Sequence, residues 1–136
     1  MTPYQKWTLI SVSSGVLAVI LGAFGAHSLK PLLSPEQVES FHTASFYHFI
    51  HTIVLLIIAI TMKNNIHPYL RWAAILIFTG IVFFSGSLYL LASRDVLQMP
   101  SWGLFGLITP AGGLFLIVGW MFFGLSVWKT TNTMVK

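Results

Sequence analysis

The sequence has 136 residues, of which 56% are hydrophobic and 7% are charged, and its formal net charge is +4. Soluble domains carry about a quarter charged residues because their surface faces water. Seven Lys and Arg and three Asp and Glu cannot cover a globule of this size, so most of its surface must face hydrocarbon. The absence of cysteine excludes disulfides and thiolate chemistry. Composition therefore predicts an integral membrane protein with one domain, residues 1–136.

The basic residues are scattered rather than clustered. They stand singly at the ends of apolar stretches, at Lys6, Lys30, Lys63, Arg71, Arg94, Lys129 and Lys136. A nucleic-acid site would need a basic run or a basic helix face, so we expect no nucleic-acid partner. Single basic residues in these places are typical of topology determinants and of contacts with lipid headgroups. The partner that they predict is the lipid bilayer.

Apolar segments long enough to cross a membrane, which takes about 20 helical residues, occur in four places. They cover residues 7–26, 35–62, 70–92 and 103–128. The first also has features of a signal peptide, but it is longer than a usual signal core and the rest of the chain is equally apolar. The sequence therefore predicts an all-α, four-helix membrane bundle.

Local signals mark the start of the second helix and a perturbation in the fourth. Ser34, followed by Pro35 and then Gln37, matches an N-cap with proline in the first turn and a capping box. The helix that starts at Pro35 is longer than the hydrocarbon core, so its first two turns should lie in the headgroup region. Pro110 lies early in the fourth segment and should kink it or weaken a backbone hydrogen bond.

The basic residues also predict the orientation of the spans. Five of the seven, including Lys6 and Lys129, fall on the side of the termini, against Lys30 and Arg94 on the other side. Because basic residues are enriched on the cytoplasmic side of membrane proteins, this bias predicts that both termini are cytoplasmic.

The two halves of the chain are locally similar at an offset of 65 residues. Residues 3–7 (Pro-Tyr-Gln-Lys-Trp) align with residues 68–72 (Pro-Tyr-Leu-Arg-Trp), and Pro35 aligns with Pro100. A duplication would make each half a helical hairpin of the same orientation, a parallel repeat. Over the whole alignment the identity is close to that of any two apolar sequences, so chance similarity stays an alternative.

Small residues recur at spacings of three and four, which in membranes marks faces where helices approach closely. The glycines in these patterns are Gly15, Gly22 and Gly25 in the first segment, Gly86 in the third and Gly113 in the fourth. We expect them to pack helices together, with a pore or a ligand cleft as the alternative. A leucine at Gly22 is expected to disturb the fold more than a leucine at Gly119.

The second helix carries most of the polar content. Tyr47 and His51 lie one turn apart on a stripe that must face the bundle interior or water. We expect a neutral His51 that is hydrogen-bonded between helices, and a His48 that lies at the membrane interface. The spacing of His48 and His51 would allow a shared metal ion, but His27 is the only further histidine in reach. We therefore predict no metal and no cofactor.

Catalytic constellations are not evident. The acidic residues Glu36, Glu39 and Asp95 all belong to the predicted outer surface. Ser85 and Ser87 have no His–Asp relay at their depth. The sequence gives no support for an enzyme.

Short motifs occur on all four predicted helices. They are Leu21–His27 (LGAFGAH), Tyr47 with His51 and Thr52, Phe84–Tyr89 (FSGSLY), and Thr109–Gly113 (TPAGG) followed by Gly119 and Trp120. In these motifs and their order the chain resembles the small four-helix membrane proteins of the bacterial YwdK and YgdD type, a family related to the transmembrane protein 256 group. The resemblance covers nearly the whole chain. It implies a four-helix bundle but no activity, because the family is one of unknown function.

The resemblance also implies a polar cluster in the outer half of the membrane. Its members are His27, Tyr47, His51, Ser85, Ser87, Tyr89 and Thr109. A relative has glutamine at the position of His48, which argues against a metal pair of His48 and His51. The motifs add Gly112 to the packing glycines. The alternative interpretation of the cluster is an interhelical network that only fixes the fold.

The first functional hypothesis is a non-enzymatic, multi-pass protein of the bacterial cell membrane. It would bind a lipid, a small hydrophobic molecule or a membrane-protein partner. The alternative is a small transporter or channel component with a proton or solute path near His51, which with four spans would need a homo-oligomer. A membrane enzyme or redox subunit would need a bound cofactor.

Overall fold

The first two helices begin at capped proline turns. In the computed structural model, which describes residues 1–64 and 67–134, α1 spans Pro3–Phe24 and α2 spans Pro35–Thr61. The hydroxyls of Thr2 and Ser34 accept the backbone N–H of the third helical residue, a glutamine in both helices, whose side chain bonds back to the cap. The capping box predicted at Ser34 is confirmed.

The first and third spans each contain a π turn. α1 continues into the π turn η1 (Gly25–Leu29) and the short 3₁₀ helix η2 (Lys30–Leu32). The third span consists of α3 (Pro68–Gly80), the π turn η3 (Ile81–Ser85) and α4 (Gly86–Ser93). Single π turns inside α-helices are frequent at functional sites.

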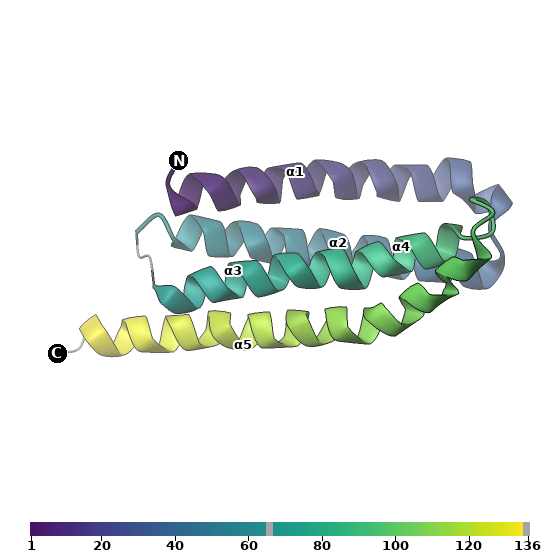
Figure 1. Cartoon of the computed structure of the whole chain (residues 1–136). Coiled ribbons are helices and arrows are strands. Elements are labelled where there is room, and N and C mark those ends of the chain that lie inside the picture. Colours follow the sequence, from purple (N-terminus) through teal and green to yellow (C-terminus); the bar gives the residue numbers. More distant parts are fainter. Residues whose placement is uncertain (65–66, 135–136) are drawn as a thin grey trace.

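The fourth span changes helix type near its start. It begins with the 3₁₀ helix η4 (Pro100–Leu107) and continues as α5 (Ile108–Met134). Pro110 lies in the first turn of α5, where a missing N–H is tolerated. The chain axis bends where η4 meets α5, in the green part of the fourth span (Figure 1). The perturbation expected at Pro110 therefore takes the form of a helix junction just before it.

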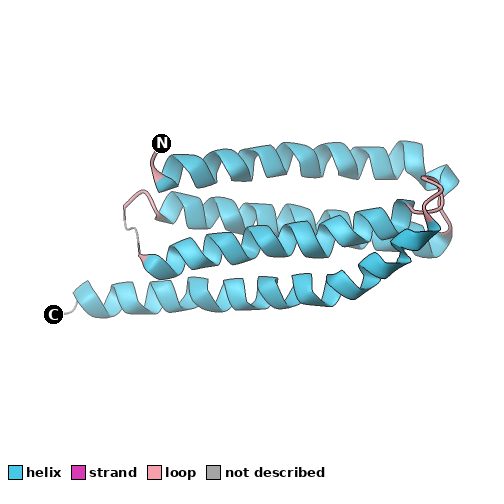
Figure 2. Ribbon diagram, in the orientation of Figure 1, coloured by secondary structure: helices cyan, strands magenta, loops and turns pink. Residues whose placement is uncertain are grey.

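The four spans lie side by side and antiparallel (Figure 1), and every regular element in the described residues is helical (Figure 2). Within those residues four helical segments of 25 to 30 residues are apolar enough to cross a membrane. α1 packs on α2, α2 packs on α3 and α4, and α3 packs on α5. Both termini lie at the end where α2 finishes and α3 begins (Figure 1). The predicted all-α membrane bundle is confirmed.

The internal repeat stays a prediction. Pro3 and Pro68 both open helices behind capping residues, and Pro35 and Pro100 also stand at helix starts. The π turns in the two halves, however, do not fall at matching positions.

Glycines let α5 approach the backbone of the third span. A Cβ atom on Gly112 would overlap the backbone of Phe84 in η3. A Cβ atom on Gly119 would lie 3.1 Å from the backbone nitrogen of Ile77 and 2.9 Å from its side chain. Because backbone cannot move aside as the end of a flexible side chain can, the close packing of α5 depends on these two glycines.

Two of the glycines predicted to pack helices instead border open space. A Cβ atom on Gly22 or Gly86 would meet nothing within 4 Å. The expectation that Gly22 is more sensitive than Gly119 is therefore wrong, because spacing identifies a face of small residues but not the neighbour that covers it. The remaining predicted glycines in contact with side chains are Gly25 against the ring of Phe41, Gly15 against Thr52 and Gly113 against Phe84.

Replacing Gly112 by alanine is expected to lower the free energy of unfolding by about 1–3 kcal/mol, the usual cost of overpacking a core. The matched variant Gly22→Ala adds the same methyl group in open space and is expected to leave stability unchanged. Thermal unfolding of both variants in the same detergent measures the difference. Equal losses of stability in the two variants would contradict the close approach of α5 to η3.

The orientation of the bundle is expected to place the end with both termini in the cytoplasm, because that end carries most of the basic residues. A fluorescent protein that matures only in the cytoplasm, fused after the last residue, should give a strong signal in cells. A fusion partner that is active only outside the cytoplasm should stay inactive at the same site. The opposite pair of results would invert the topology.

Candidate functional site

A layer of polar side chains divides the apolar core into two clusters. Near the end with the termini, α2, α3 and α5 share a cluster that includes Leu55, Ile77 and Leu116. Near the other end, Phe41 and Ala92 belong to a second, smaller cluster. The buried polar residues between the clusters are Ser14, His48, His51, Thr52, Ser85 and Ser87. In hydrocarbon such groups must be satisfied within the protein.

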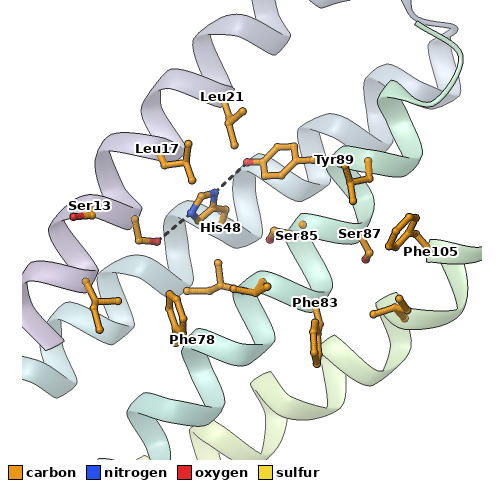
Figure 3. A pocket seen from close by; sticks show the side chains of 17 residues that line it. Ser13, Leu17, Leu21, His48, Phe78, Phe83, Ser85, Ser87, Tyr89 and Phe105 are labelled. Atoms are coloured by element: carbon orange, nitrogen blue, oxygen red, sulfur yellow. Dashed lines mark hydrogen bonds between the residues drawn. The ribbon is translucent and has the colours of Figure 1, made fainter. Parts of the chain in front are cut away.

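His48 is the centre of a hydrogen-bonded relay that joins α1, α2 and α4. The hydroxyls of Thr52 and Ser14 are 2.7 Å apart, and Ser14 Oγ lies 3.1 Å from Nε2 of His48. Nδ1 of His48 lies 3.3 Å from Tyr89 Oη, which is also 3.3 Å from Ser45 Oγ. Figure 3 shows the two bonds of the imidazole, one toward α1 and one toward Tyr89.

The hydrogen-bond donors of this relay can be assigned one after another, starting from Tyr89. Tyr89 has a single proton and donates it to Ser45, so Nδ1 of His48 must donate to Tyr89. In a neutral ring, which the hydrocarbon surroundings favour, Nε2 is then the acceptor for Ser14, whose oxygen accepts in turn from Thr52. The relay engages both ring nitrogens, one as donor and one as acceptor.

The position of His48 corrects the sequence analysis, which placed it at the membrane interface. His48 lies halfway along α2 and is 4% exposed. At a rise of 1.5 Å per residue it is about 20 Å from either end of the helix. Periodicity would have found it, because the buried positions of α2 recur at intervals of three and four: Phe41, Ala44, His48, His51, Leu55 and Ile58.

His51 forms a second polar group, between α2 and α5. Its Nδ1 donates to the carbonyl of Tyr47 at 2.8 Å, and its Nε2 accepts the indole N–H of Trp120 at 3.3 Å. The ring of Tyr47 stacks on His51 with centroids 5.6 Å apart and is 38% exposed. Within the described residues no hydrogen bond connects this group with the relay of His48.

The residues predicted to form one outer-half cluster therefore lie in separate groups. Ser87 and Thr109 form a third group, with hydroxyl oxygens 2.7 Å apart between α4 and α5. His27 lies in η1, where it is exposed and has no hydrogen bond to any described residue. Tyr89 belongs to the relay. The motifs identified residues that join helices, but the face that each residue occupies depends on packing.

A groove of about 710 Å³ runs between α1 and the third span (Figure 3). It forms because α1 packs mainly on α2. Leu17 and Leu21 line it from α1, Phe78 and Val82 line it from the third span, and His48 reaches it from α2. Leu17 is 49% exposed and Val82 is 48% exposed, so the groove opens sideways toward the lipid.

Ser85 lies in the wall of the groove beside His48 (Figure 3). It ends the π turn η3 and is 1% exposed. Its hydroxyl has no hydrogen-bond partner. Sequence reasoning grouped Ser85 with Ser87, but Ser87 bonds to Thr109 and to the carbonyl of Phe84. The two serines of the motif therefore have different environments.

Charged groups lie away from the groove, whose lining residues include no acid, lysine or arginine. At the end opposite the termini, Gln37 donates to Asp95 at 2.6 Å and Arg94 lies 3.6 Å from the same carboxylate. Among the residues that the structure describes, no three side chains of metal-binding type come together. The chemistry that the groove offers is hydrogen bonding within an apolar surface.

Comparison with known proteins gives a family. Residues 21–113 match the family described as "Protein of unknown function (DUF423)". The chain is 35% identical over 125 residues to a UPF0382 membrane protein of Staphylococcus aureus (strain bovine RF122 / ET3-1), covering 92% of this chain and 97% of that protein. It is 33% identical over 112 residues to the UPF0382 inner membrane protein YgdD of Escherichia coli (strain K12), covering 82% of this chain and 81% of that protein. No solved structure matches the chain.

These relatives confirm the resemblance found in the motifs and the predicted location. Both relatives are membrane proteins of bacteria by name, and this chain has four helices of membrane-spanning length in its described part. The chain is a multi-pass protein of the cell membrane.

Replacing His48 by alanine is expected to lower the free energy of unfolding by about 1–3 kcal/mol, because Ser14 and Tyr89 lose their partner in a buried layer. His51→Ala should cost less, since His51 makes one bond to another helix, to Trp120. His42 is exposed, so His42→Ala serves as the control. Thermal unfolding in detergent ranks the three variants, and a His48 variant as stable as the His42 variant would contradict the relay.

Proposed function

For this chain, a member of the DUF423 family of membrane proteins of unknown function, we propose a non-enzymatic binding role. It binds a lipophilic small molecule in the groove between α1 and the third span. The observation that carries this proposal is the groove itself, an apolar space of about 710 Å³ with a hydrogen-bonded floor at the middle of the membrane.

The size and lining of the groove support binding of a small molecule. Ligand pockets typically measure about 300–1,000 Å³ and combine an apolar lining with a few placed polar groups. Here leucine and phenylalanine side chains supply the apolar surface, and Ser14, His48, Ser85 and Tyr89 supply the polar groups. A helix bundle that only needed stability would close such a space, because interiors pack densely.

The sideways opening supports a ligand that arrives from the bilayer. The part-exposed residues Leu17, Val82 and Phe83 line the groove. In a membrane these surfaces face acyl chains rather than water. A lipophilic molecule dissolved in the bilayer would therefore reach the groove without crossing an aqueous phase.

The placement of ionisable groups supports a role in binding rather than catalysis. Glu36, Glu39 and Asp95 are exposed at the end of the bundle opposite the termini. Both nitrogens of His48 are engaged in the relay. The groove thus has no group placed to act as a general base for a bound molecule.

The alternative role, a proton or solute path near His51, has less support. Both ring nitrogens of His51 are bonded, and this residue does not line the groove. The relay through His48 ends at Thr52 and Ser45, which both lie within α2. A binding site accounts for the groove between α1 and the third span, whereas a path through His51 does not account for it.

Filling the groove tests this function. Leu17→Trp places a large ring in the groove, whereas Val19→Trp places the same ring on an exposed, lipid-facing position of α1 outside it. Native mass spectrometry of protein gently extracted from cell membranes should show a lipophilic adduct on the wild type and on Val19→Trp. Leu17→Trp should carry little or none of it.

The proposal fails if the wild type carries no adduct beyond lipids that wash out equally from every variant. It also fails if Leu17→Trp retains the adduct at wild-type occupancy. Thermal unfolding of the two tryptophan variants shows whether they are folded to the same extent.

A further inference from the structure

Ser85 differs from the other buried serines of the described residues in that its hydroxyl is unpaired. Ser11 donates to the carbonyl of Trp7 at 2.8 Å, as serines in helices commonly do. Ser14 is part of the relay, and Ser87 is bonded to Thr109. Ser85 is 1% exposed and its Oγ has no partner, although it lies in the wall of a groove.

The unpaired hydroxyl is unfavourable unless something else bonds to it. A buried polar group without a hydrogen bond destabilises the folded state, and no water is at hand in the hydrocarbon layer. The π turn η3 places Ser85 at its end, with the N–H of Gly86 bonded to the carbonyl of Ile81. Turns of this kind are frequent at functional sites. The arrangement points to a bound group as the missing partner.

The remaining polar atoms around Ser85 are already engaged. His48 and Tyr89 belong to the relay, in which both ring nitrogens and the Tyr89 hydroxyl are bonded. Ser14 donates to His48 and accepts from Thr52. Ser13 lines the groove at an exposed position of α1, so Ser85 carries the buried hydroxyl of the lining that no described residue engages.

The ligand group must be uncharged. The groove is lined by no acid, lysine or arginine, and His48 at its floor lies about 20 Å from either end of α2. A charge at this depth would be costly without a partner. A phospholipid headgroup, which stays at the membrane surface, would leave Ser85 unpaired.

A carbonyl oxygen fits Ser85 better than a second hydroxyl does. A carbonyl accepts the serine proton and brings no donor of its own. A ligand hydroxyl would bring a further proton that needs an acceptor, and the groove-lining oxygens of Ser14 and Tyr89 each accept one bond already. An apolar body next to the carbonyl would occupy the surface of Leu17, Leu21 and Phe78.

We infer that the ligand of this groove is a neutral lipid with a carbonyl group, and that its carbonyl oxygen accepts a hydrogen bond from Ser85 at the middle of the membrane. This inference rests on the proposed binding function and adds the chemical class of the ligand. Ser85 would select the carbonyl, and the apolar walls would hold the hydrocarbon part.

Three probes of equal chain length test the inference: a dodecanone, a dodecanol and dodecane. Binding is measured by isothermal titration to the purified protein in a maltoside detergent, which contains no carbonyl. The wild type should bind dodecanone about tenfold more tightly than dodecane, as one buried hydrogen bond allows. Ser85→Ala should bind the two probes equally.

Infrared spectroscopy of the bound dodecanone, with an isotope-labelled carbonyl, reports the hydrogen bond itself. The carbonyl stretch should move to lower frequency on binding to the wild type and should stay at its apolar position in Ser85→Ala. Ser11 is also a buried serine, but it lies outside the groove lining and its hydroxyl is bonded to the carbonyl of Trp7. Ser11→Ala is therefore the matched control and should keep both the affinity and the shift.

The outcomes separate this inference from the function on which it rests. Equal binding of dodecanone and dodecane by the wild type, with no shift of the carbonyl stretch, would overturn the role of Ser85 and leave the groove as a binding site. Tighter binding of dodecanol than of dodecanone would overturn the carbonyl. Failure of all three probes to bind, in the wild type as in Leu17→Trp, would overturn both proposals.

Discussion

A histidine halfway across a membrane must find its hydrogen bonds inside the protein, because hydrocarbon offers none. His48 meets this constraint through Ser14 on α1 and Tyr89 on α4. The same two bonds fix how α1 and the third span lie on α2. Interhelical bonds in membranes average only about 0.6 kcal/mol, so their main effect is to specify this arrangement. The polar layer also keeps the two apolar clusters apart, and the groove opens beside it.

On its side away from the groove, the third span packs closely against α5. α5 lies so close to η3 that Gly112 has no room for a side chain against the backbone of Phe84. The π turn is thus held by α5 on one side while Ser85, at its end, lines the groove on the other. Ser87 adds a bond to Thr109 on α5 in the next turn. Packing at the α5 interface therefore positions a hydroxyl that has no part in that interface.

Structural features that depend on residues close together in the chain could be predicted from the sequence. Features that depend on neighbouring helices could not. The capping box at Ser34 and the four spans rest on local chemistry, and the structure has them. His48 was predicted at the membrane interface, whereas the three-and-four spacing of the buried positions of α2 places it inside the bundle. Gly22 and Gly119 look alike in sequence, yet only Gly119 lies against another backbone. Ser85, whose hydroxyl is unpaired, ends a π turn, and no residue pattern in the sequence predicts that turn.

The two walls of the groove are held unequally, and this suggests how a ligand would enter. The wall formed by the third span is packed against both α2 and α5, whereas α1 packs mainly on α2. The contacts of α1 with α2 include the hydroxyl of Ser14, and Gly25 in the adjoining π turn η1 lies against Phe41 of α2. A small displacement of α1 would widen the groove without disturbing the close contact at Gly112. α1 would then be the wall that moves, and the Ser85 hydroxyl would stay in place on the other wall.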